Sequence, residues 1–283
     1  MIAVLCAAAS AAVFGAADFS GGVATRRSSA VAATMLARLA SLPVLALLLP
    51  FAAGGGPRLA DLGWGVGAGF AGGAGVLLLY RGLASGAMTL VAPVTAVTAA
   101  VLPLVAGLAL DRWPGTVALA GVGCAIVAIG LVSLVSGGRG PVSTGHPSRL
   151  IGIALAAGAA FGLFYTLLGQ AGDGSGLWPL VGAQLASTTL VAGLAWRRRV
   201  SLRLPGPALR WAMAAGVLDM VANAFYLFAV QQGLLSVVAP VASLYPVSTV
   251  LLALTVDRER LRPVQVTGLG LAATALVLVA GAA

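Results

Sequence analysis

Residues 87–110 read AMTLVAPVTAVTAAVLPLVAGLAL, a run of 24 residues without a charged side chain. A helix of about 20 apolar residues crosses the hydrocarbon core of a bilayer, which is roughly 30 Å thick. The run is too long and too uniformly apolar for the alternating strand of an outer-membrane barrel, and backbone groups in lipid must be satisfied within their own segment. It therefore predicts a transmembrane helix.

Runs of similar length recur along the whole chain of 283 residues, and the composition agrees with them. Hydrophobic residues make up 60% and charged residues only 8%, whereas a soluble domain carries about 25% charged residues. A soluble fold so poor in charge has too little polar surface to face water. We predict ten membrane spans, at residues 2–18, 30–52, 62–80, 87–110, 114–136, 150–171, 177–196, 209–230, 234–256 and 263–282.

The two halves of the chain repeat each other. Val91-Ala92-Pro93-Val94 matches Val238-Ala239-Pro240-Val241 at a shift of 147 residues. Further matches fall at shifts of 147 or 146: Phe14-Gly15 with Phe161-Gly162, Gly86 with Gly233, Gly121 with Gly268, and Leu39-Ala40-Ser41 with Leu185-Ala186-Ser187. The sequence thus predicts a first repeat over 1–136, a polar linker over 137–149 and a second repeat over 150–283.

The repeat has a consequence for topology. Each half holds five predicted helices, and because five is odd the second half enters the membrane from the opposite side. The predicted fold class is therefore an all-α integral membrane protein of ten transmembrane helices, arranged as two inverted five-helix repeats. Many secondary transporters use this arrangement for alternating access.

These landmarks resemble the drug/metabolite transporter superfamily, specifically its ten-helix EamA-type members. The second half carries the resemblance best, through Ala229-Val230-Gln231-Gln232-Gly233, Pro240, Pro246, Glu259-Arg260 and Gly268. The first half fits at Gly82-Leu83, Gly86, Pro93 and Gly121. It departs in two places: Asp111-Arg112 replaces the family's Glu-Arg, and the proline expected near residue 99 is absent, with Pro103 nearby instead. The resemblance implies a secondary carrier for small metabolites, often an exporter, and does not identify the solute.

Charged side chains inside a bilayer are costly and are default candidates for function. Asp219 lies near the centre of the eighth predicted span and Arg38 within the second. Asp219, Asn223 and Tyr226 are spaced i, i+4, i+7 and share one helix face. We expect Asp219 to carry a proton or bind the solute, with Arg38 as its partner or as a dock for an anionic group. The alternative is that the two charges only neutralise each other.

Other polar residues are weaker pathway candidates. Gln184 is the repeat counterpart of Arg38, so the two can meet near the pseudo-two-fold axis at mid-membrane. Gln231 extends the polar character at the end of the eighth span. Asp18, at the predicted end of the first span, is expected at the membrane interface. Asn223 and Tyr226 can equally serve as helix-packing hydrogen bonds.

Several function classes are disfavoured. The 16 basic residues are all Arg, and nearly all of them sit in short gaps between apolar runs, not on the solvated face that nucleic-acid binding needs. The sequence has no His/Cys/Asp/Glu cluster with metal-ligand spacing and no GxxxxGK[ST] phosphate loop. We therefore expect no enzyme activity, no metal and no cofactor. The expected partners are the lipid bilayer and a small solute, with protons as a candidate coupling ion, in a monomer or homodimer.

The Arg residues also predict orientation in the cytoplasmic (inner) cell membrane. Loops after the odd-numbered spans hold 13 of the 16 Arg, and loops on the other side hold only Arg58 and Arg112. The positive-inside rule then places the odd loops in the cytoplasm and both termini outside. The family resemblance favours termini inside. The functional expectation is a secondary transporter of a small polar or amphipathic metabolite or drug, working by alternating access, and the family resemblance implies an exporter. The alternative is a non-transporting membrane scaffold or sensor.

Overall fold

The computed structural model describes residues 1–25, 28–51, 56–83, 88–110, 113, 115–133, 147–172, 174–256 and 263–282. All regular structure in these residues is helical, with no strand among them. The elements are α1 (Ile2–Thr25), α2 (Ala30–Leu48), η1 (Leu49–Phe51), α3 (Leu59–Leu83), α4 (Met88–Leu110), α5 (Thr116–Ser133), α6 (Pro147–Gly169), α7 (Trp178–Arg197), α8 (Gly206–Val230), α9 (Leu235–Ala242), α10 (Tyr245–Val256) and α11 (Pro263–Ala282).

Each of the ten predicted spans contains a helix. Six helices in the described residues are long and apolar enough to cross a membrane, namely α1, α2, α3, α6, α7 and α8. The other four spans contain shorter apolar helical stretches, at Val94–Leu110, Thr116–Leu131, Leu235–Ser248 and Val266–Val279. α1 runs to Thr25, beyond the predicted end at residue 18, so Asp18 lies well inside the helix.

The predicted span 234–256 is broken into two helices. α9 ends at Ala242 and α10 begins at Tyr245, with Ser243 and Leu244 in a turn between them. Pro246 follows in the first turn of α10, where a proline is tolerated because the first N–H groups of a helix have no intrahelical acceptor. A continuous helix through residue 246 would have placed the proline ring against the preceding turn.

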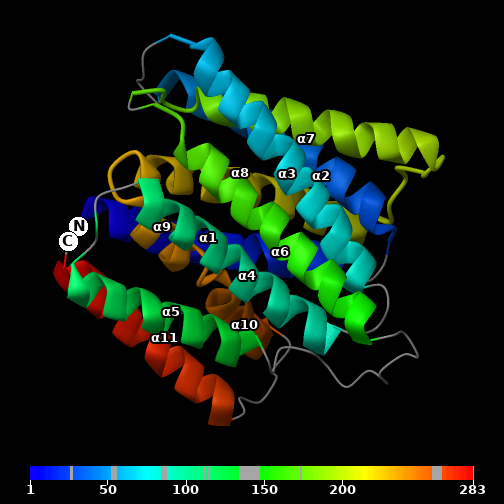
Figure 1. Cartoon of the computed structure of the whole chain (residues 1–283). Helices are drawn as coiled ribbons and strands as arrows, with labels where there is room; N and C mark the ends of the chain where they lie inside the picture. The colour runs from blue at the N-terminus through cyan, green and yellow to red at the C-terminus, as the bar shows by residue number, and fades with distance from the viewer. Residues whose placement is uncertain are drawn as a thin grey trace.

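The helices of the two halves are interleaved. α2, α3 and α7 form one side of the bundle, α5 and α11 the other, and α1, α4, α6, α8 and α9 lie between them (Figure 1). The closest helix neighbours are mostly from opposite halves: α1 packs on α8, α3 on α6 and α7, α2 on α8, and α5 on α11. The N- and C-terminal ends lie beside each other at one edge (Figure 1).

Glycines permit close helix crossings between the halves, and two of them are Gly69 and Gly216. A Cβ on Gly69 of α3 would overlap the backbone of Ala183 on α7, and a Cβ on Gly216 of α8 would overlap the backbone of Ala37 on α2. Small residues at such crossings allow backbones in a membrane to approach closely. Glycine at these positions therefore fixes how α3 meets α7 and how α8 meets α2.

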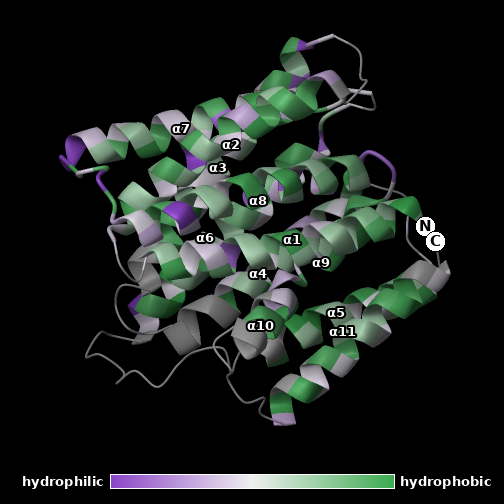
Figure 2. Ribbon diagram, turned by 180° about the vertical axis from the view of Figure 1, so that it is seen from behind, coloured by the Kyte–Doolittle hydropathy of each residue, from purple (hydrophilic) through white to green (hydrophobic). Residues whose placement is uncertain are grey.

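Hydrophobic residues run along the full length of the helices, and the hydrophilic ones gather mainly at helix ends and connecting turns (Figure 2). Arg197 ends α7, Arg198 and Arg199 follow it directly, and Arg203 precedes α8. Arg149 lies in the first turn of α6 and Arg210 in that of α8. These charges thus sit at helix ends rather than along helix faces.

Candidate functional site

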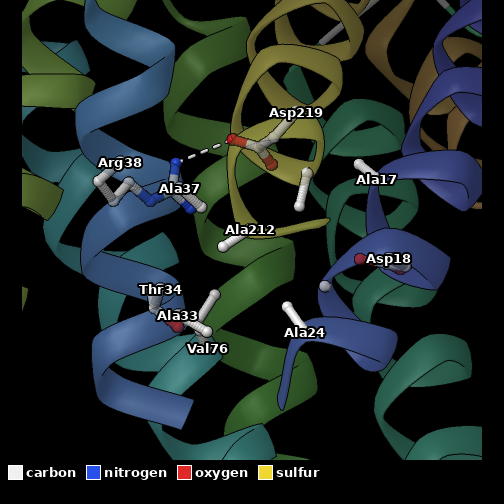
Figure 3. A pocket seen from close by; sticks show the side chains of 12 residues that line it. Ala17, Asp18, Ala24, Ala33, Thr34, Ala37, Arg38, Val76, Ala212 and Asp219 are labelled. Carbon is white, nitrogen blue, oxygen red and sulfur yellow. Dashed lines mark hydrogen bonds and ion pairs between the residues drawn. The ribbon is translucent and has the colours of Figure 1, made fainter. Parts of the chain in front are cut away.

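A partly open cavity of about 90 Å³ lies between α1, α2, α3 and α8 (Figure 3). Its polar lining consists of Asp18 from α1, Thr34 and Arg38 from α2, and Asp219 from α8. The rest of the lining is small or apolar: Ala17, Gly21, Ala24, Ala33, Ala37, Val76, Ala212 and Ala215. The cavity exists because most of these side chains are small, and its four polar side chains are the groups that could bind a polar ligand.

Arg38 and Asp219 form an ion pair across this cavity. Arg38 Nη1 donates to Asp219 Oδ2 at 2.9 Å, and the two side chains are 18% and 26% exposed. Both residues lie near the middle of their helices. The pair therefore joins α2 of the first half to α8 of the second at about mid-depth, as the sequence allowed.

Asp18 faces the same cavity from the other side. Its side chain is exposed to the cavity, although α1 continues for almost two more turns. Figure 3 shows its carboxyl group directed toward the space in front of the Arg38–Asp219 pair. The expectation that Asp18 sits at the membrane interface followed from too short a first span, and the longer helix places the carboxyl group at the cavity.

Gln184 binds α2 beside the ion pair. Its Nε2 donates to the carbonyl oxygen of Arg38 at 2.8 Å and also to Ser41 Oγ. Ser41 Oγ in turn donates to the Arg38 carbonyl oxygen at 2.7 Å, and Ser187 Oγ to the Gln184 carbonyl oxygen at 3.3 Å. Arg38 and its repeat counterpart Gln184 thus meet directly, through the backbone of one and the side chain of the other.

Two buried polar atoms near the pair have no hydrogen-bond partner among the described residues. Asn223 Nδ2 donates to the Asp219 carbonyl oxygen at 2.7 Å, but Asn223 Oδ1 is buried and unpaired. Thr34 is 6% exposed and its Oγ1 is likewise unpaired. An unpaired buried polar group costs about 1–3 kcal/mol, so a polar ligand or water beside these atoms would be stabilised.

Tyr226 and Gln231 lie away from the cavity. Tyr226 is fully buried and its hydroxyl donates to the Tyr165 carbonyl oxygen at 3.0 Å, in an aromatic cluster with Phe14, Phe164 and Tyr245. Gln231 Nε2 donates to Ser175 Oγ at 2.9 Å and to the Gly176 carbonyl oxygen at 3.1 Å, which ties the end of α8 to the α6–α7 connection. Both contacts join helices of the second half.

Sequence reasoning did not single out Thr34 or the alanines of the cavity wall. Thr34 precedes Arg38 by four residues and so shares its helix face, which is a signal that the sequence carried. The alanines carried none, because alanine is abundant throughout a chain of this composition. Among the described residues, no group of three or more His, Cys, Asp or Glu side chains is placed to hold a metal ion.

Comparisons with known proteins address the family and the fold. A search of curated proteins found no match. One solved structure, titled only as the crystal structure of a protein, has a TM-score of 0.73 and 16% sequence identity, with 98% of each chain covered. That likeness extends over the whole chain but at this identity shows the fold alone.

The model of the EamA-like transporter family matches residues 148–281. These residues span α6 to α11, the second predicted repeat. Because the family consists of membrane transporters, the match agrees with the long apolar helices and with the expected lipid environment. The resemblance drawn from sequence landmarks is confirmed in the second half of the chain, which is similar to the EamA-like transporters, consistent with the drug/metabolite transporter superfamily.

Proposed function

We propose that this protein is a secondary transporter that moves a small polar or amphipathic solute by alternating access between two inverted five-helix halves. The observation that carries the proposal is the cavity beside the Arg38–Asp219 pair, at mid-helix between the halves, in a chain whose second half matches the EamA-like transporters. In inverted-repeat transporters the solute site lies near the bilayer midplane at the interface of the repeats. Export is the direction that the family resemblance favours.

The helix contacts support an inverted repeat. If α1, α2 and α3 correspond to α6, α7 and α8, then exchanging the halves turns the α1–α8 contact into α6–α3, and the α2–α8 contact into α7–α3. All four contacts are present, as are the self-equivalent pairs α2–α7 and α5–α11. A two-fold relation between the halves accounts for these six contacts, since it maps each of them onto another of the six or onto itself.

Individual residues support the same relation. At the repeat shifts, Gly69 corresponds to Gly216 and Ala183 to Ala37, and the two glycine–alanine crossings are therefore counterparts. Ser41 and Ser187 also correspond, and each donates to the carbonyl oxygen three residues earlier, that of Arg38 or Gln184. Close approaches and hydrogen bonds agree with the symmetry that the sequence repeat predicts.

Among the described residues, larger side chains occupy two positions of the second half that correspond to cavity residues of the first. At the shift of 147 residues, Ala17 corresponds to Phe164, and Asp219 corresponds to Gly72. The Phe164 ring fills the space that a side chain on Gly72 would need. Asp18 corresponds to Tyr165, which is buried and packed on Phe14 and Tyr226. The two halves therefore contribute differently to the interface, and the polar lining of the cavity from the first helix of a half comes from the first half.

A scaffold or sensor remains the second candidate, and one observation favours it. The Arg38–Asp219 pair satisfies both charges without any ligand, so it can be purely structural. A non-transporting protein with an inert pair would keep its fold and bind no solute.

A flux assay on purified protein in proteoliposomes, across a panel of metabolites and with imposed proton or sodium gradients, tests the proposal. We expect accumulation or release of at least one solute, abolished or uncoupled by Asp219→Asn. Folded, monodisperse protein that moves no solute under any gradient contradicts transport and favours the scaffold. A proton role for Asp219 would appear as flux that follows the imposed pH gradient.

A further inference from the structure

The charges that line the cavity do not balance. Arg38 and Asp219 neutralise each other at 2.9 Å. Asp18 is the third charged residue of the lining, and among the described residues it has no ion-pair partner. The described walls of the cavity therefore carry a net charge of −1 with all three groups ionised. In the interior of a membrane protein such a charge is costly unless a counter-charge is supplied.

We propose that Asp18 binds an ammonium group, so that the solute taken by this cavity is a small compound bearing a protonated amine. The inference rests on the proposed transport function and specifies its substrate class. A cation beside Asp18 neutralises the carboxylate, and Thr34 Oγ1, buried, unpaired and in the same lining, can accept one of the N–H groups. The neighbouring alanines and Gly21 give an apolar wall with room for a short alkyl group.

Other ligand chemistries fit these walls less well. An anion would have to compete with Asp219 for Arg38 while lying near two carboxylates, which repel it. A metal ion needs several ligands, and no group of three candidate side chains occurs among the described residues. A neutral solute supplies no counter-charge for an ionised Asp18. Of these ligands, an ammonium group supplies both a counter-charge for Asp18 and N–H donors for its carboxylate and for Thr34 Oγ1.

Simple amines and amino acids share the ammonium group, and the cavity distinguishes them through Arg38. A guanidinium has five N–H donors, and the contact with Asp219 uses Nη1. We expect the carboxylate of an amino acid to bind the remaining donors while its ammonium group lies at Asp18, which Figure 3 shows on the opposite side of the pocket from Arg38. An amino acid would then bind more tightly than the matching simple amine.

The test uses four probes of similar size and different charge: isobutylamine, isobutanol, isobutyrate and valine. Binding to the purified full-length protein in detergent is measured by calorimetry at constant pH. We expect isobutylamine, valine or both to bind, and isobutanol and isobutyrate to bind at least about tenfold more weakly, a difference of about 1.4 kcal/mol. Tighter binding of valine than of isobutylamine identifies the amino-acid class, and the reverse identifies simple amines.

Variants assign the binding to Asp18. We expect Asp18→Asn to weaken amine binding by about tenfold or more, and Asp18→Glu to restore part of it. Asp61→Asn makes the same charge change outside the cavity, in the first turn of α3, and should leave amine binding unchanged. If Asp18→Asn does not purify as a folded protein, comparing Asp18→Glu and Thr34→Val with wild type replaces it, and both should weaken binding.

Three results overturn the inference: no binding of either amine to wild type, preferential binding of isobutyrate, or amine binding that survives Asp18→Asn unchanged. Its failure is distinguishable from failure of the proposed function. Flux of a solute without an amine, unaffected by Asp18→Asn, refutes the ammonium site and leaves transport intact. Amine binding that depends on Asp18 but is accompanied by no flux refutes transport and leaves the site intact.

Discussion

Arg38 on α2 and Asp219 on α8 are 181 positions apart in the chain and 2.9 Å apart in space. Each residue comes from a different half, and the backbone of Arg38 is held in addition by Gln184 of the second half. The pair is thus the point where charge, cavity and the interface of the two halves coincide. If one half moves against the other, the Arg38–Asp219 ion pair must either change its length, break, or move together with α2 and α8.

The first prediction separates a working ion pair from an inert one. We expect Asp219→Asn and Arg38→Gln each to lower stability by about 1.5–3 kcal/mol, the range for a hydrogen bond to a charged group, and each to abolish or uncouple flux. The double variant removes both charges, so it should regain much of the lost stability because no unpaired charge is left. Thermal unfolding in detergent and proteoliposome flux give the two readouts.

The double variant decides between the two interpretations. If the pair is only structural, Arg38→Gln/Asp219→Asn should recover flux together with stability. If the charges act in transport, stability should recover and flux should not. Wild-type flux and pH dependence in both single variants would refute a transport role for the pair.

The second prediction concerns Gln184. Replacing it with Leu leaves the Arg38 carbonyl oxygen and Ser41 Oγ with one hydrogen bond fewer between α2 and α7, and we expect a loss of about 1–3 kcal/mol. Thr189→Ala is the control on the same helix, because Thr189 is exposed and bonds only to its own helix, at Leu185 and Ala186. An equal loss of thermal stability in the two variants would contradict the bridging role of Gln184.

The third prediction tests the paired helix crossings. Gly216→Ala and Gly69→Ala each place a methyl group against the backbone of a facing helix, at Ala37 or Ala183. Overpacking of this kind costs about 1–3 kcal/mol. Gly193→Ala and Gly152→Ala add the same methyl group in open space and should be neutral. Similar losses at positions 69 and 216 are expected from the two-fold relation, and a loss at only one of them would argue against equivalent crossings.

The fourth prediction concerns orientation in the membrane. In a background without Cys6 and Cys124, Ser201→Cys lies in the exposed connection between α7 and α8, and Gly56→Cys lies just before α3. The positive-inside rule predicts that an impermeant thiol reagent applied to intact cells labels position 56 and not position 201. Labelling of both after membrane permeabilisation is the control. The opposite pattern would place the termini in the cytoplasm, as the family resemblance favours.

The sequence determined the membrane class and the helix positions, and it predicts the division into two repeats. Long uncharged runs can be stable only as helices in lipid, and this local requirement located a helix in every predicted span. It also nominated Arg38, Asp219 and Gln184, because a charged or long polar side chain within an apolar run is costly wherever the helix packs. Helix ends were less certain, since α1 continues through apolar and small residues to Thr25 without a breaking signal at Asp18.

Tertiary structure alone decided which of these polar residues meet. The spacing of Asp219, Asn223 and Tyr226 gave one face, yet Asp219 borders the cavity while Tyr226 bonds to the Tyr165 backbone, because α8 is surrounded by different helices along its length. Asp18 lines the cavity because α1 packs against α8. These two helices are far apart in the sequence. Local hydropathy fixes where a helix forms, whereas the choice of its neighbours depends on long-range packing of small residues such as Gly216 on Ala37, which no single segment encodes.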